Sequence, residues 1–131
     1  MTLPSQHISI SVNRPAADVY AFASNPENLP LWASGLSGSI RRDGEEWIAD
    51  SPMGQIRIAF AEKNTFGVLD HDVTVASGQT FSNPMRVFPN ADGSDIVFTL
   101  YRQPEMSDEE CAADAKLIEK DLRTLKDILE R

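Results

Sequence analysis

The chain has 131 residues, of which 41% are hydrophobic and 24% are charged, and these proportions are ordinary for one globular domain, residues 1–131. Its formal net charge of −8 argues against binding of nucleic-acid phosphates or of an anionic membrane surface, since both rely on lysine and arginine. Only one cysteine, Cys111, is present, which excludes an intrachain disulfide and a cysteine-based metal site.

The first elements expected along the chain are a strand and two short helices. Residues 7–13 alternate apolar and polar side chains, which predicts a strand with one buried face. Pro15 suits a first helical position, because its missing N–H would have no partner there. Asn25 can cap a second short helix, which we expect to end at Pro30 and to leave Trp32 as an apolar anchor.

Strand-like runs separated by turn residues follow, at 36–42, 45–51, 55–63, 67–76, 79–88 and 94–102. Asp43–Gly44 is a strong hairpin signal between the first two of them. Pro84 implies a bulge or an edge within the run 79–88, because proline cannot donate to a strand ladder. No helical pattern interrupts these runs, so we predict an antiparallel meander.

The clearest local prediction is a long amphipathic helix from Ser107 to Arg131. Ser107 and Glu110 have the spacing of a capping box, which starts a helix. One apolar stripe follows at steps of three and four residues: Cys111, Ala115, Ile118, Leu122, Leu125 and Leu129. No other large element is available to cover the apolar face of the sheet, so we expect this helix to cover it and to leave a space beneath.

This order of elements resembles the helix-grip fold of the SRPBCC superfamily, which includes START lipid-transfer domains, birch-pollen-allergen-type proteins and polyketide cyclase/dehydrase-like proteins. The likeness is strongest in the first-helix pattern and in two strand segments: Pro15, Val19, Phe22, Asn25–Pro26, Leu29, Trp32, Gly67–His71 and Phe98–Arg102. The resemblance implies an α+β fold, with a seven-stranded antiparallel sheet wrapped around the C-terminal helix. It also implies a pocket for a small hydrophobic or amphipathic molecule, for example an aromatic or polyketide-like one. The superfamily holds both binding proteins and enzymes, so the resemblance does not decide between them.

We expect the pocket to lie between the concave face of the sheet, the C-terminal helix and the second short helix. Side chains expected to line it are Trp32, Trp47, Phe60, His71, Met85, Phe98, Ala115, Ile118 and Leu122. Ordinary core packing is the alternative role for each of the apolar ones, and the two roles are compatible.

His71 is the first candidate for chemistry, because its strand phase places it on the apolar face. It could act as a general base, since the reference pKa of histidine is near 6.5. The alternative is a cavity-wall histidine that is hydrogen-bonded to a neighbour, as buried polar groups must be. Asp70 and Asp72 point to the opposite face, so a carboxylate that orients His71 would come from elsewhere, for example Asp114 or Asp121.

Arg86 is the second candidate, because bulges such as the one expected at Pro84 can re-aim a side chain towards a site. Turned inward, it could hold a ligand carboxylate or enolate; turned outward, it is a solvated strand residue. An enzyme of this kind would be a cyclase, dehydratase or isomerase, with His71 as the general base and Arg86 or Tyr101 stabilising oxyanion charge.

A third possibility is a protein-interaction module similar to the domain that activates the heat-shock-90 chaperone ATPase, using the acidic helix surface 107–121. We expect neither a metal nor another cofactor, since His7 is the only histidine besides His71. The N-terminal residues lack the basic and apolar regions of a signal peptide, and the apolar runs are too short for a membrane span, so we expect a cytoplasmic protein. The sequence leaves open whether it forms a homodimer.

Overall fold

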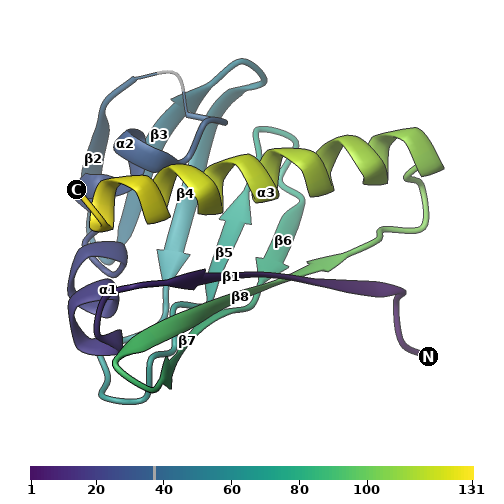
Figure 1. The fold of residues 1–131 in the computed structure, drawn as a ribbon. Helices are drawn as coiled ribbons and strands as arrows, with labels where there is room; N and C mark the ends of the chain where they lie inside the picture. The colour runs from purple at the N-terminus through teal and green to yellow at the C-terminus, as the bar shows by residue number, and fades with distance from the viewer. Residues whose placement is uncertain (37) are drawn as a thin grey trace.

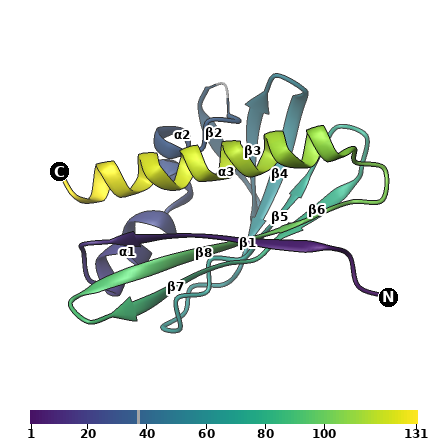
Figure 2. The same cartoon turned by 45° about the vertical axis from the view of Figure 1, so that its right-hand side comes forward.

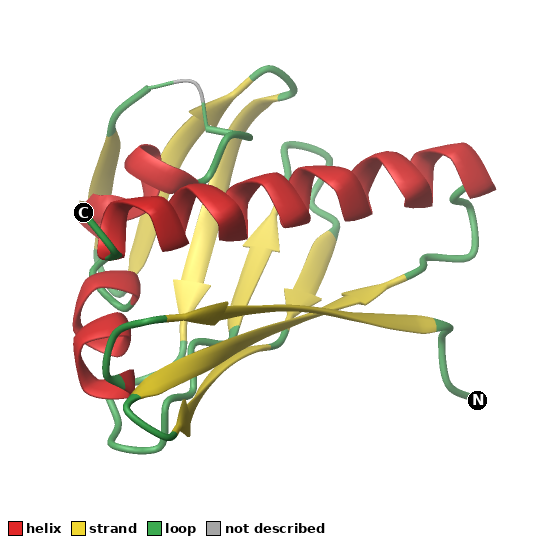
Figure 3. Cartoon of the chain, in the orientation of Figure 1, coloured by secondary structure: helices red, strands yellow, loops and turns green. Residues whose placement is uncertain are grey.

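The computed structural model describes residues 1–36 and 38–131 and shows an α+β fold. Its elements are β1 (Ser5–Val12), α1 (Ala16–Ala23), η1 (Pro26–Asn28), α2 (Leu29–Trp32), β2 (Ile40–Asp43), β3 (Glu46–Ser51), β4 (Gly54–Phe60), β5 (His71–Thr74), β6 (Thr80–Asn83), β7 (Met85–Asn90), β8 (Gly93–Tyr101) and α3 (Asp108–Leu129). The long helix α3 runs across the strands, and α1 and α2 lie towards its C-terminal end (Figures 1 and 3). In the second view, strands β2 to β6 fan out behind α3, which crosses in front of them (Figure 2).

The strands form two antiparallel sheets, with the orders β1-β8-β7 and β2-β3-β4-β5-β6. The prediction of one seven-stranded sheet is therefore wrong. The single run predicted at 79–88 is two strands that separate at Pro84. Asn83 pairs with His71 in β5, whereas Met85 pairs with Phe98 in β8. Proline has no N–H to donate to a ladder, so Pro84 is a natural point for the chain to pass from one sheet to the other.

The two sheets are joined where the segment before β5 runs beside β7. The Leu69 amide donates to the Met85 carbonyl at 2.8 Å, and the Val87 amide donates to the Gly67 carbonyl at 3.0 Å. This short ladder covers only part of the run predicted as a strand at 67–76. These hydrogen bonds hold β7 of the first sheet beside the segment that leads into β5 of the second sheet. The junction thereby shapes the concave surface that faces α3.

The segment after α1 follows the predicted pattern with one correction. The Asn25 side chain accepts a hydrogen bond from the Glu27 amide at 3.1 Å and caps η1, as expected. Pro30 does not end the second helix; it lies in the first turn of α2, where its missing N–H costs nothing. Leu29 and Trp32 are buried there, at 5% and 7% exposure, which confirms Trp32 as an anchor.

Helix α3 begins as predicted. The Glu110 amide donates to the Ser107 hydroxyl and the Ser107 amide donates to the Glu110 carboxylate, each at 3.1 Å, which completes a capping box. The helix packs most closely through its C-terminal half, where Leu122, Leu125 and Leu129 are buried. Within residues 1–36 and 38–131, no helix combines the length and apolar character needed to cross a membrane.

The N-terminal half of α3 is less tightly covered, and this difference positions the site. Ala115 is its only buried residue, while Cys111 and Ile118 on the same apolar stripe stay partly accessible. The main core therefore lies under the second half of the helix, next to α1, β1 and β8. Below the first half and the middle of α3, the packing leaves two hollows.

Candidate functional site

The first hollow, which we call the inner cavity, has a volume of about 260 Å³ and lies between α2, the strands β4 to β6, β8 and α3. Residues that matter for its chemistry are Trp32, His71, Asn83, Phe98, Ile118 and Asp121. Most of the remaining lining is aliphatic. The inner cavity therefore has the general character of a small-molecule site, a half-open apolar pocket with few polar groups.

The second hollow, the outer cavity, has a volume of about 360 Å³ and continues from the first towards the N-terminus of α3. The two share four lining residues: Val73, Asn83, Phe98 and Ile118. At its open end lie Met53 and Leu117, two large apolar side chains that are 77% and 48% exposed. A molecule longer than the inner cavity could extend past Ile118 into this space.

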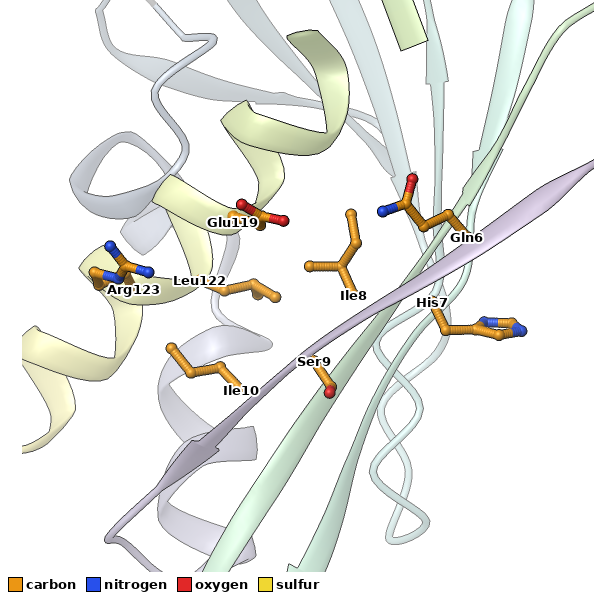
Figure 4. Close-up of a pocket in the computed structure, with 8 residues that line it drawn as sticks. All are labelled: Gln6, His7, Ile8, Ser9, Ile10, Glu119, Leu122 and Arg123. Atoms are coloured by element: carbon orange, nitrogen blue, oxygen red, sulfur yellow. The ribbon is translucent and has the colours of Figure 1, made fainter. Parts of the chain in front are cut away.

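A further groove of about 320 Å³ lies between β1 and α3 (Figure 4). Ile8, Ile10 and Leu122 point towards each other there, while His7 points away from the helix (Figure 4). Ile8 and Leu122 are already 6% and 1% exposed, and Glu119 and Arg123 line the same groove. It therefore offers a ligand less apolar surface than the two cavities do.

His71 lies in a row of side chains that crosses three strands on the inner face. In the strand register it pairs with Phe60 of β4 on one side and Asn83 of β6 on the other. Directly paired residues share a face of the sheet. The ring centroid of His71 is 5.8 Å from that of Phe60 and 6.0 Å from that of Phe98, so aromatic rings enclose the imidazole.

The hydrogen bonding of His71 assigns its tautomer. Nδ1 lies 3.0 Å from the Leu69 carbonyl oxygen, and a carbonyl can only accept, so Nδ1 carries the proton. Burial lowers the pKa of His71 and outweighs the opposing effects of the Leu69 carbonyl, Asp70 and Asp72. The neutral ring leaves Nε2 as an acceptor, and no described residue hydrogen-bonds to it.

Trp32 contributes the opposite kind of group. Its side chain lines the inner cavity, and the residue is only 7% exposed. Its indole Nε1–H is buried, and no partner for it exists among residues 1–36 and 38–131. Buried indole N–H groups usually find an acceptor, so this donor is a notable exception.

Asp121 is the only charged residue among those that line the inner cavity. It accepts hydrogen bonds from the amide and the hydroxyl of Ser34, at 3.0 and 2.6 Å. Burial raises the pKa of Asp121, and the two Ser34 bonds oppose that shift. Asp114 lines the outer cavity, and burial and nearby Glu110 raise its pKa too. Neither carboxylate is bonded to His71, so the suggested orienting role has no support among the described contacts.

Arg86 lies outside both cavities and turns outward. Its Nε and Nη2 donate to the two carboxylate oxygens of Asp70, at 3.0 and 2.9 Å. The Arg86 hydrogen bond is the largest cause that lowers the pKa of Asp70, and a bond from the Met85 amide adds to it. Asp70 thus points away from His71, as strand alternation predicts. The pair links β7 to the segment before β5 and has no access to a ligand in the cavities.

The other predicted lining residues divide into two groups. Trp32, His71, Phe98, Ile118 and Leu122 line the inner cavity. Four others lie in or beside the core without reaching either cavity: Trp47, Phe60, Met85 and Ala115. Tyr101, the other candidate for stabilising oxyanion charge, lines the outer cavity.

Asn83 was missed, although it lines both cavities and lies opposite His71. The available signal was its place next to Pro84, at the end of a strand. Among the described residues, no group of three or more His, Cys, Asp or Glu side chains could hold a metal ion.

Comparison with solved structures gives the fold. An uncharacterized protein from Bacillus thuringiensis is 14% identical and has a TM-score of 0.76, over 96% of this chain and 98% of that one. DynU16, from the dynemicin biosynthetic locus, has a TM-score of 0.74 at 16% identity, over 96% of this chain and 47% of its own. Ara h 8.0201 has a TM-score of 0.67 at 11% identity, over 97% of both chains.

These neighbours indicate a helix-grip fold. Identities this low carry no information about activity or ligand. No family model matches the chain, and no curated protein does.

Proposed function

We propose that this protein binds a small hydrophobic or amphipathic molecule, of aromatic or polyketide-like type, in the inner cavity, with the outer cavity as an extension. The observation that carries the proposal is the apolar inner cavity beneath α3, which is rich in aliphatic and aromatic walls and poor in charge.

The dimensions of the site support a compact ligand. Small-molecule sites typically have volumes of roughly 300–1,000 Å³. The inner cavity, at about 260 Å³, is just below this range, and the outer cavity, at about 360 Å³, is within it. The described packing thus suits a molecule with a small ring system, or a longer one that occupies both spaces.

Native mass spectrometry of freshly purified protein, followed by solvent extraction, tests the proposal. We expect the protein to carry an apolar molecule, or to gain thermal stability from members of a broad hydrophobic library. An empty protein that shows no thermal shift with any member of the library would contradict the proposal.

One observation favours a second candidate, catalysis with His71 as the general base in a cyclase, dehydratase or isomerase reaction. The Nδ1–H of His71 donates to the Leu69 carbonyl oxygen, which leaves Nε2 of the neutral ring as an acceptor with a fixed direction. A general base requires such an acceptor. Arg86 faces outward to Asp70, whereas Tyr101 lines the outer cavity and is the remaining candidate to stabilise oxyanion charge. Once a substrate is found, a His71→Ala variant with full turnover would eliminate this candidate.

A further inference from the structure

The side chains that line the two cavities beneath α3 carry negative charge and no positive charge. From this we infer that the ligand is a cationic amphipath, a protonated amine on an aromatic or aliphatic body, and that carboxylic acids are rejected. The inference rests on the proposed function, because it concerns the same site. It adds the charge of the ligand, which apolar walls alone leave unspecified.

The charged side chains of the site come from one face of α3. Asp114 lines the outer cavity and Asp121 lines the inner cavity, while Ile118 between them lines both. Spacings of four and three residues place these three side chains on the same face of a helix. Neither lysine nor arginine lines either cavity, and no ion pair among the described residues involves Asp114 or Asp121. The site therefore holds two carboxylates without a paired cation.

Asp121 has an oxygen atom to offer to a ligand cation. Both bonds from Ser34 go to Oδ1, which leaves Oδ2 without a described hydrogen bond. In residues 1–36 and 38–131, Nε1 of Trp32 is the only side-chain nitrogen or oxygen that is both buried and without a partner, so Oδ2 of Asp121 is accessible. Burial raises the pKa of Asp121 and of Asp114. A ligand cation beside either carboxylate would stabilise its charged form.

His71 adds an acceptor and no positive charge. Burial lowers its pKa, and its Nδ1–H donates to the Leu69 carbonyl oxygen, so Nε2 of the neutral ring accepts. Nε2 has no described hydrogen bond either, and by the same reasoning it is accessible at the inner cavity that His71 lines. Uncharged groups at the cavities, such as Asn83 and Tyr101, can donate or accept and favour neither kind of ligand. An ammonium group, which only donates, therefore suits the remaining polar groups.

Charge selects the ligand even where no direct contact forms. Coulomb interactions extend over about 8 Å at physiological salt and are screened less where water is excluded. Each cavity is lined by one carboxylate, so a charged group in either cavity experiences its field. The inner cavity is half-open, which lets an ammonium group keep part of its hydration. A ligand carboxylate would lose hydration and be repelled as well, so its binding is disfavoured.

Three probes that share a naphthalene ring and differ in charge test this inference by calorimetry at pH 7.5: protonated 2-naphthylmethylamine, 2-naphthylmethanol and 2-naphthoate. We expect the amine to bind roughly tenfold more tightly than the alcohol, as one net hydrogen bond to a charged group would give. The carboxylate should bind more weakly than the alcohol. Added salt should narrow the difference between the amine and the carboxylate.

Two aspartate variants locate the effect. Asp121→Asn removes the charge but keeps an oxygen that can accept from Ser34, and it should reduce the advantage of the amine over the alcohol severalfold. Asp127→Asn removes the same charge from an exposed position on α3 outside both cavities, and it should leave the advantage unchanged. If Asp121→Asn does not fold, Asp114→Asn and the wild-type probe series keep the inference testable.

The outcomes separate the two proposals. If the amine and the alcohol bind equally well, or if 2-naphthoate binds most tightly, the site binds apolar ligands but the inference about charge is wrong. Equal reductions in Asp121→Asn and Asp127→Asn would assign the effect to the net charge of the protein and would also overturn it. If no probe binds and the apolar library also fails, both the inference and the proposed function are wrong.

Discussion

Asp121 of α3 accepts two hydrogen bonds from Ser34, one from its amide and one from its hydroxyl. This contact fastens the segment that follows α2 to the middle of the long helix. Leu36 and Gly35 on that segment line the inner cavity, so the contact also holds one of its walls in place. A polar interaction at the edge of the site thus supports an apolar wall of the inner cavity.

Replacing the carboxylate of Asp121 should destabilise the cavity wall formed by the segment after α2. In Asp121→Ala, the Ser34 amide and hydroxyl lose their acceptor, and we expect the free energy of unfolding to fall by about 1 kcal/mol in urea denaturation. Asp127→Ala is the matched control, because Asp127 is an exposed aspartate on the same helix without a hydrogen bond to the cavity wall. Equal stability of the two variants would show that the Ser34 contact contributes nothing.

Blocking the passage between the cavities should abolish binding. Ile118 lines both, so Ile118→Trp is expected to reduce the affinity for any ligand of the site by at least about tenfold. Ala112→Trp places the same indole on the exposed side of α3 and should leave affinity unchanged. Undiminished binding in a folded Ile118→Trp variant would place the site elsewhere.

The lowered pKa of His71 makes stability depend on pH. In the unfolded chain the ring has its ordinary pKa near 6.5. Below 6.5, and down to the lower pKa of the folded state, the unfolded chain binds more protons, so stability falls as the pH falls. Unfolding of wild type and His71→Phe between pH 7.5 and 5 should show a shallower decline in the variant. Other titrating groups, including Asp121, are common to both proteins, and parallel curves would refute this account.

Gly67 lies at the junction of the two sheets, with a φ of +74°. An added Cβ would collide with the carbonyl oxygen of Val87, in the ladder that joins β7 to the segment before β5. Gly44 is the control, because its φ is also positive, at +66°, but open space surrounds it. Its replacement by alanine therefore causes backbone strain without a collision. We expect Gly67→Ala to cost about 1–3 kcal/mol more than Gly44→Ala in thermal unfolding. Equal costs would mean that the junction tolerates displacement.

We expect the ion pair of Arg86 with Asp70 to contribute to the fold and not to ligand binding. The side chains of the two residues are 45% and 35% exposed, and exposed pairs contribute at most about 1 kcal/mol. Arg86→Met should therefore change stability slightly and leave ligand affinity or turnover unaltered in a binding or activity assay. A loss of binding in a folded Arg86→Met protein would restore Arg86 as a site residue.

The elements that the sequence predicted well are those with local causes. The capping box at Ser107 and the alternation in residues 7–13 act within a few residues, and both appear in the structure. The inward phase of His71 was predictable for the same reason, because alternation along a strand is local.

The errors came from contacts between distant segments. Pro84 was expected to perturb one strand, but the partners of Asn83 and Met85 lie in β5 and β8, and the residue pattern alone does not reveal these pairings. The outward direction of Arg86, one of its two expected alternatives, is set by its bonds to Asp70 in the segment before β5, a partner that the residue pattern alone does not reveal. Ala115 lies on the expected stripe and is buried, yet it does not line the inner cavity, whereas Ile118 and Leu122 on the same stripe do.

An apolar ligand bound beneath α3 would change the surroundings of one tryptophan indole, and a ¹H–¹⁵N NMR spectrum shows each indole N–H signal separately. The chain has two tryptophans, and Trp32 lines the inner cavity while Trp47 does not. During titration with 2-naphthol, a compact aromatic probe, we expect the Trp32 indole signal to move and the Trp47 signal to stay in place. If both indole signals remain fixed while 2-naphthol binds, the ligand does not bind beneath α3.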